Sequence, residues 1–276
     1  MKVNLLNYIE KDSVVHRLSG TTKFICFLIL SFASIITYDI RVILLLLVLS
    51  FTALKVSKIK IKEVKYMFSY IVAFLIINFI LLYIFNPNYG PDLYNSRTVL
   101  FHIAGNYDVT LEQLFYQLNV SSKYFIALPL AVLFISTTNP SEFASSLNSL
   151  RVPYKICYSI ALALRYIPDI QKDYIDISKS EQARGIELGK GARFHKRFIN
   201  AAKILLPLIL LSISRIDTIS NAMELRCFGK NKKRTWYKYK KMNKNDYICI
   251  FICVLLFILT LVMIKVDGSR FFNPFM

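Results

Sequence analysis

The sequence has few cysteines, few histidines and few acidic residues. Its 276 residues include 5 Cys, 3 His and 17 Asp or Glu against 35 Lys or Arg, and the formal net charge is +18. An odd number of thinly spread cysteines excludes the framework of a small disulfide-stabilised extracellular domain. Charged residues make up only 19% and hydrophobic residues 55%, which excludes a disordered chain and argues against a wholly soluble domain.

What the sequence has in abundance is long apolar segments. A helix needs ~20 mostly apolar residues to cross the hydrocarbon core of a bilayer. We therefore predict an all-α fold, a polytopic helical membrane protein with about five transmembrane helices. The candidate spans are residues 24–38, 42–54, 66–85, 124–135 and 247–264. Residues 199–213 are also apolar, but they carry Lys203 and Pro207, so we expect them to be interfacial or partly embedded.

The distribution of Lys and Arg predicts the orientation, because short loops rich in these residues stay in the cytoplasm. Residues 55–65 contain five Lys, and residues 139–245 are also basic, so we place both segments and the N-terminus in the cytoplasm. Residues 86–122 hold one basic residue against three acidic ones, which predicts an external loop. The chain then divides into a transmembrane region, 1–138, the cytoplasmic region, and a transmembrane helix with an external tail, 246–276. We expect a multi-pass protein of the plasma membrane without a cleavable signal peptide.

The cytoplasmic region is predicted to be helical. Three helices are expected, at residues 141–150, 154–185 and 198–226. Ser141 is predicted to cap the first of them. In the second, apolar residues recur every three or four positions and form one continuous stripe, which predicts a long amphipathic helix. Pro168 and Pro207 are predicted to kink the second and third helices.

The two long helices end in similar sequences. One end reads Ala183-Arg184-Gly185, and the other reads Ala222-Met223-Glu224-Leu225-Arg226. An Arg at a helix end presents a permanent charge and a fixed fork of donors, which suits a partner groove lined with carboxylates or carbonyls. Alternatively, each Arg only stabilises the helix dipole, by ~0.3–1 kcal/mol. The residues alone leave both interpretations open.

These helix ends resemble the paired Ala-Arg-Gly motifs of the transmembrane T component of energy-coupling factor (ECF) transporters, the EcfT/CbiQ family. The likeness extends from about residue 10 to residue 230. Further segments that resemble the family, in the same order, are Asp12-Ser13-Val14-Val15-His16-Arg17-Leu18, Thr137-Thr138-Asn139-Pro140 leading to Leu150-Arg151-Val152-Pro153, and Arg165-Tyr166-Ile167-Pro168. The chain departs from the family pattern at Val14, where Pro is expected, and at Cys227, where Gly is expected. Because Cys tolerates a positive φ poorly, Gly229 is predicted to cap the second helix end instead.

The resemblance implies a scaffold that transmits motion. Members of this family join two cytoplasmic ABC-type ATPases to a membrane-embedded S component, which binds a vitamin or a transition-metal ion. ATP and Mg²⁺ belong to the ATPases, so the resemblance implies no cofactor in this chain. The ATPase-binding residues that it implies are Ala183, Arg184, Gly185, Ala222, Glu224 and Arg226. It also implies that helices kinked at Pro168 and Pro207 are the coupling helices.

The sequence gives less support to other functions. The chain has no phosphate-binding loop of the Gly-x-x-x-x-Gly-Lys-[Ser/Thr] type, so we expect it not to hydrolyse ATP itself. We predict no metal site, because His16, His102 and His195 are far apart and are expected on different sides of the membrane. Residues 230–244 are basic and precede a span, so we expect them to contact anionic lipids and not nucleic acid.

Two alternatives remain open. A permease would bind substrate directly, and a membrane-embedded enzyme such as a lipid transferase would need an acidic or His cluster at the cytoplasmic face. Asp169, Asp173 and Asp176 share one helix face and are the possible nucleus of such a cluster. We interpret them instead as the solvated side of the second cytoplasmic helix, and we predict no catalytic residues.

Overall fold

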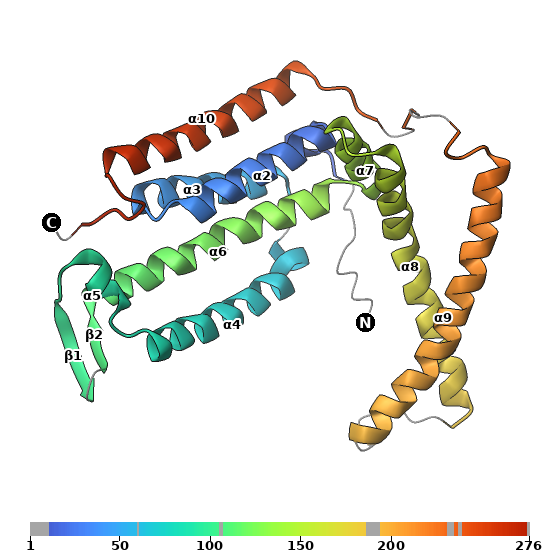
Figure 1. Ribbon diagram of the computed structural model, residues 1–276, viewed down its shortest axis with the longest axis horizontal. Helices are drawn as coiled ribbons and strands as arrows, with labels where there is room; N and C mark the ends of the chain where they lie inside the picture. Colours follow the sequence, from blue (N-terminus) through green and yellow to red (C-terminus); the bar gives the residue numbers. More distant parts are fainter. Residues whose placement is uncertain are drawn as a thin grey trace. The chain divides into compact units, whose positions relative to one another are not determined.

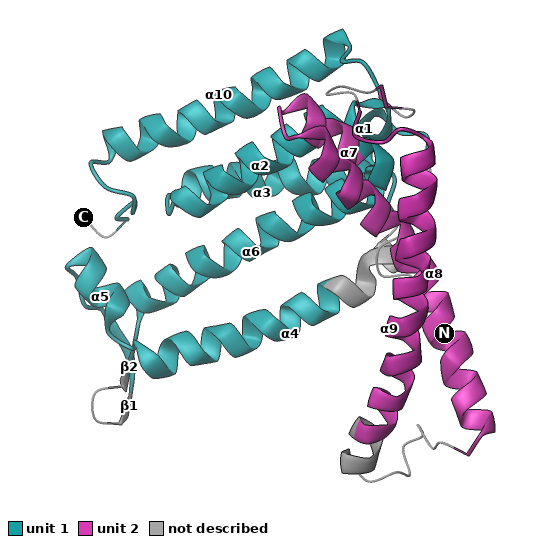
Figure 2. Ribbon diagram, turned by 45° about the vertical axis from the view of Figure 1, so that its right-hand side comes forward, with its two compact units in different colours: residues 1–142, 240–276 teal, residues 143–239 magenta. Residues whose placement is uncertain are grey.

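The computed structural model describes residues 11–59, 61–104, 107–185, 194–230, 235–236 and 239–274 (Figure 1). The chain forms two compact units (Figure 2). Unit 1 contains residues 1–142 and 240–276, and unit 2 contains residues 143–239.

Unit 1 is a bundle of helices with one small hairpin. Its helices are α1 (Val14–Arg17), α2 (Gly20–Ile36), α3 (Ile40–Val56), α4 (Ile61–Phe85), α5 (Tyr89–Tyr94), α6 (Leu111–Thr137) and α10 (Lys244–Val266). The strands β1 (Val99–Ala104) and β2 (Tyr107–Thr110) pair antiparallel between α5 and α6. The prediction of an all-α polytopic fold is confirmed.

Each of the five predicted spans coincides with a helix of unit 1. Among the described residues, four segments are long and apolar enough to cross a membrane: Phe68–Phe85, Leu111–Thr137, Ile199–Leu225 and Lys244–Val266. The helix α2 is apolar but has only 17 residues, which is near the lower limit for a span. Two expectations change. The helix α6 begins well before residue 124, inside the predicted external loop, and the segment expected at the interface is long enough to span.

The core of unit 1 lies where α2, α3, α6 and α10 pack together. Ala33, Ile43 and Ile126 have no exposed surface, and they belong to one cluster of buried apolar side chains. The small side chain of Ala33 allows close approach of the neighbouring helices. Leu46 and Leu256 complete the contact from α3 and α10.

Polar groups fasten the helix ends of unit 1. Asp246, in the first turn of α10, accepts hydrogen bonds from the backbone N–H groups of Asn243 (2.7 Å) and Ser19 (2.8 Å). The starts of α2 and α10 are therefore tied together. At the other end of α10, Arg41 in the first turn of α3 forms ion pairs with Asp39 (2.9 Å) and with Asp267 (2.6 Å), the C-cap residue of α10. The two ends of α10 are thus tied to two different helices, α2 and α3.

Unit 2 consists of the rest of α7 (Pro140–Ser149), then α8 (Tyr154–Ala183) and α9 (Phe194–Leu225). The α7 prediction needs one correction. Asn139, not Ser141, caps this helix, because the Asn139 Oδ1 atom accepts the Ser141 backbone N–H at 3.1 Å and Pro140 takes the first helical position.

The helices α8 and α9 pack against each other and cross (Figures 1 and 2). At the contact, Arg215 Nη2 lies 2.7 Å from Asp173 Oδ2, and the Arg215 guanidinium lies 5.9 Å from the centre of the Tyr166 ring. The sequence predicts that Asp173 lies on the solvated side of α8, but this ion pair places it at the contact with α9. Asp169 and Asp176 are exposed.

Candidate partner-binding site at two arginine-capped helix ends

The first candidate end is the C-terminus of α8. Arg184 is the C-cap residue, and its backbone N–H donates to the carbonyls of Ser180 (3.2 Å) and Glu181 (3.1 Å). Gly185 follows with a φ of 85°, and a Cβ atom there would meet nothing within 4 Å. Glycine is therefore favoured at this position because of its left-handed backbone and not because of a lack of space.

The Arg184 side chain is largely available to a partner. It forms an ion pair of 3.0 Å with Glu181, one turn earlier, and it is 71% exposed. An exposed pair at this spacing stabilises a helix by only ~0.3–0.5 kcal/mol. Glu181 can therefore orient the guanidinium without holding it against a competing carboxylate.

The second candidate end is the C-terminus of α9, and it closes in the same way. Arg226 is at the equivalent position, and its backbone N–H donates to the Ala222 carbonyl at 3.3 Å. The Cys227 N–H then bonds the Glu224 carbonyl and the Phe228 N–H bonds the Met223 carbonyl, both at 2.9 Å. These two bonds define a Schellman motif, in which the residue after the C-cap is left-handed.

Cys227 takes that left-handed position, with a φ of 52°. The prediction that Gly229 replaces it is wrong, since Gly229 also has a positive φ, 88°, but lies two residues later in a separate turn. The hydrogen bonds of the motif thus impose on Cys227 the backbone that glycine adopts freely, at a cost of ~1–2 kcal/mol.

An aromatic cluster packs next to this second helix end. The Phe228 ring lies 4.7 Å from that of Tyr158 and 5.6 Å from that of Tyr154. The Trp236 ring lies 5.5 Å from that of Tyr154, and its Nε1 atom donates to Asn148 Oδ1 at 3.1 Å. Sequence reasoning assigned Trp236 to a lipid-binding basic segment and missed this cluster. The spacing of Tyr154 and Tyr158, one turn apart, was the available signal.

All six predicted contact residues are exposed: Ala183, Arg184, Gly185, Ala222, Glu224 and Arg226. Leu225, which sequence reasoning did not single out, is 87% exposed beside Arg226. An apolar side chain this open at a helix tip adds contact area next to the charge. Pro168 and Pro207 lie inside α8 and α9, which continue through both residues.

The two arginines do not share one site. The start of α8 lies beside the segment that follows α9, since a Cβ atom on Gly229 would lie 3.7 Å from Lys155 Cε, so the helices run antiparallel. Arg184 and Arg226 each follow a residue of the Asp173–Arg215 pair by eleven positions. At 1.5 Å per residue the two ends are on the order of 30 Å apart.

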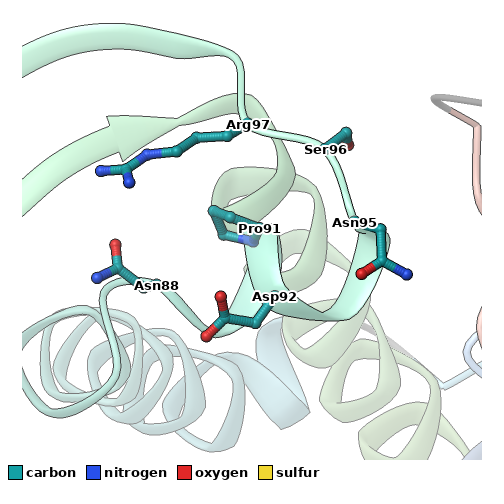
Figure 3. Close-up of a pocket in the computed structure, with 6 residues that line it drawn as sticks. All are labelled: Asn88, Pro91, Asp92, Asn95, Ser96 and Arg97. Atoms are coloured by element: carbon teal, nitrogen blue, oxygen red, sulfur yellow. The ribbon is translucent and has the colours of Figure 1, made fainter.

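Other candidate chemistry is sparse. In the described part of the chain, no group of three or more His, Cys, Asp or Glu side chains could hold a metal ion. A shallow pocket of about 270 Å³ lies between α5 and the loop that follows it, with Arg97 on one side and Asn88 and Asp92 on the other (Figure 3). Hydrogen bonds from His102 and Arg97 hold the pKa of the nearby Asp108 carboxyl below its usual value.

Comparison with known proteins places the chain in a family. The model of the family CbiQ, cobalt transport protein, matches residues 11–237. The chain is 26% identical to the energy-coupling factor transporter transmembrane protein EcfT of Streptococcus equi, over 92% of this chain and 94% of that protein. It is 27% identical to EcfT of Exiguobacterium sibiricum, over 90% and 94% of the two chains. It is 24% identical to EcfT of Clostridium kluyveri, over 94% of this chain and 96% of that protein.

The family match covers both arginine-capped ends and the helices that carry them, and the relatives align over nearly their whole length. The chain therefore belongs to the CbiQ family, that of the transmembrane T components of ECF transporters.

Proposed function

We propose that this chain is the coupling subunit of an ECF-type ABC importer. It joins two cytoplasmic ATPases to a membrane-embedded S component and transmits ATP-driven motion between them. The observation that carries this proposal is the pair of equivalent helix ends, each with an exposed Arg at the C-cap, on the order of 30 Å apart along one helix pair. That spacing favours two partner subunits over a single bound ligand.

The chemistry of each end favours a groove that supplies acceptors. The left-handed residue at 185 or 227 ends the helix, so the preceding Arg is the C-cap residue, and its exposed guanidinium fork is within reach of a partner. A carboxylate or a set of backbone carbonyls in the partner would bind this fork in a bidentate manner. The small side chains of Ala183 and Ala222 leave room for the groove wall.

The link between the two ends supports a coupling role. The Arg215–Asp173 pair holds α8 to α9 where they cross, so displacement of one end moves the other helix as well. Apolar side chains of α9 face outward, among them Leu206 (65% exposed) and Leu210 (60%). They offer a surface for the S component, which would bind the vitamin or transition-metal ion, while ATP and Mg²⁺ stay with the ATPases.

The same proposal sets the orientation. Unit 2 must lie where the ATPases are, so we place the N-terminus and unit 2 in the cytoplasm of a cell with the chain in its plasma membrane. The basic residues of the loop after α3 agree with this placement.

A charge-reversal experiment tests the proposal. The variant Arg184→Glu/Arg226→Glu should lose both ATPases in affinity purification from mild detergent, while its amount in the membrane stays unchanged. Lys172→Glu/Lys179→Glu is the matched control, because both lysines are exposed on α8 and the change in charge is the same. Retention of both ATPases by the arginine variant would contradict the proposal, and substrate uptake by the chain without ATPases would favour a permease.

A further inference from the structure

The β1–β2 hairpin has no role in the proposed coupling. It lies between the spans α4 and α6, and Phe101 pairs with Val109 across it. In both overall views the hairpin runs across the axes of α4 and α6 and extends past the end of α4 (Figures 1 and 2). If α4 and α6 cross the bilayer, the hairpin lies along the membrane surface.

The first strand is apolar on both of its faces. Val99, Leu100 and Phe101 are 49%, 46% and 72% exposed. A register shift between Val99 and Phe101 interrupts the regular alternation of the strand, because Val99 pairs with Thr110 and Phe101 pairs with Val109. Successive side chains of β2 point to opposite faces, so Val99 and Phe101 lie on opposite faces of the ribbon. The described residues of unit 1 leave both faces open, which is unfavourable in water and suits an apolar surrounding.

The two charged side chains nearest this strand are paired with each other. Asp108 pairs with Arg97 at 2.5 Å and also contacts His102. Neither Asp108 nor Arg97 is therefore an unpaired charge beside the strand. The apolar strand, and not an electrostatic patch, is the distinguishing feature of the hairpin.

The base of the hairpin is mounted rigidly on α6. The Glu112 carboxylate, which is fully buried, accepts hydrogen bonds from the backbone N–H of Thr98 (3.0 Å) and from its hydroxyl (2.6 Å). The Gly90 N–H donates to Gln113 Oε1 at 2.7 Å, and a Cβ atom on Gly90 would lie 2.5 Å from the Gln113 backbone. The start of β1 is therefore held at the level where α6 begins.

Aromatic side chains mark that level as a membrane interface. The Tyr116 ring lies 4.9 Å from that of Tyr89 and 6.4 Å from that of Tyr38, which contacts Phe271 at 4.4 Å. Belts of aromatic side chains are typical of the headgroup region. Phe85, the last residue of α4, is 75% exposed, so the exposed apolar surface of α4 continues to the end of that helix.

We infer that β1 lies in the boundary between headgroups and acyl chains of the phospholipid leaflet at this end, with Leu100 and Phe101 inserted. The hairpin then acts as an interfacial anchor that sets the depth and tilt of α4 and α6. We assign lipid, and not a partner protein, to the surface of β1. The ribbon is apolar on both faces, and lipid can surround both, whereas a docked protein would cover only one face.

Tryptophan fluorescence tests this inference in nanodiscs that contain the full chain. In Phe101→Trp the new side chain should be quenched more strongly by phosphatidylcholine brominated near the headgroup than by lipid brominated deeper, since interfacial apolar groups reach ~5–10 Å into the bilayer. Signals are compared with the unsubstituted chain, which has the single Trp236. Asp92→Trp, at an exposed position on α5, is the matched control and should be quenched about twofold less.

Three outcomes are possible, and each decides the question. Preferential shallow quenching of Phe101→Trp, both in the chain alone and in the assembled transporter, supports lipid insertion. Equal weak quenching of Phe101→Trp and Asp92→Trp overturns it, because the strand is then in water. Quenching in the chain alone that disappears in the assembled transporter also overturns it, because a partner protein is then the occupant.

Discussion

Replacing Cys227 with glycine should tighten the end of α9. The left-handed backbone costs a residue other than glycine ~1–2 kcal/mol, and the greater freedom of glycine in the unfolded chain offsets ~0.4–1 kcal/mol of the gain. The helix end should therefore be stabilised by about 0.5–1 kcal/mol. This corresponds to an approximately two- to fivefold smaller population of the opened turn, and to amide exchange that is slower by the same factor.

Hydrogen–deuterium exchange can measure this effect locally. The reporting amides are those of residues 227 and 228, whose N–H groups bond the carbonyls of Glu224 and Met223. Exchange in the peptide that contains them should slow in Cys227→Gly and stay unchanged in Cys227→Ala, which keeps the strain. At the other helix end, Gly185→Ala should speed exchange, because a methyl group there meets nothing within 4 Å and adds only backbone strain. Unchanged or faster exchange in Cys227→Gly would refute the assignment of strain to this residue.

Two further changes test other parts of the structure. Arg215→Met leaves Asp173 unpaired at a half-buried contact, so it should weaken the packing of α8 on α9 by about 1–2 kcal/mol, seen as a broader distance distribution between spin labels on the two helices. Hydrogen bonds from His102, the larger effect, and from Arg97 lower the pKa of Asp108 in the folded hairpin. The ionised carboxylate therefore stabilises the hairpin at pH values above its unfolded pKa of ~3.9. This stabilisation is lost as the pH falls through the lowered pKa of the folded state. Proteolysis of the hairpin in short acid pulses should therefore rise below about pH 4, and Asp108→Asn should remove this pH dependence; a flat profile in the unsubstituted chain would contradict the assignment.

The helices of the bundle could be predicted from the sequence, because a long apolar run identifies a helix without information on what it packs against. The start of α6 could not be predicted in this way. Glu112, Gln113, Gln117 and Asn119 read as a polar external loop, yet all four side chains are buried. Glu112 and Gln113 accept hydrogen bonds from the backbone N–H groups of Thr98 and Gly90, and only the folded chain brings these groups within reach.

The arginine-capped ends were predictable from their sequence, but the role of Cys227 was not. Residue preference pointed to Gly229, whereas two backbone hydrogen bonds decide which residue is left-handed. Asp173 was misassigned for a similar reason. Its spacing with Asp169 and Asp176 predicts a solvated face, and its partner Arg215 lies 42 residues away on another helix.

The Arg215–Asp173 pair has a consequence for symmetry. Arg184 and Arg226 lie at equal distances along their helices from this point, and the helices run in opposite directions. An approximate twofold rotation about the crossing therefore exchanges the two tips. In the proposed complex, a dimer formed by the two ATPases would have such an axis of its own. A single asymmetric polypeptide can thus present equivalent binding ends to both subunits of a dimer.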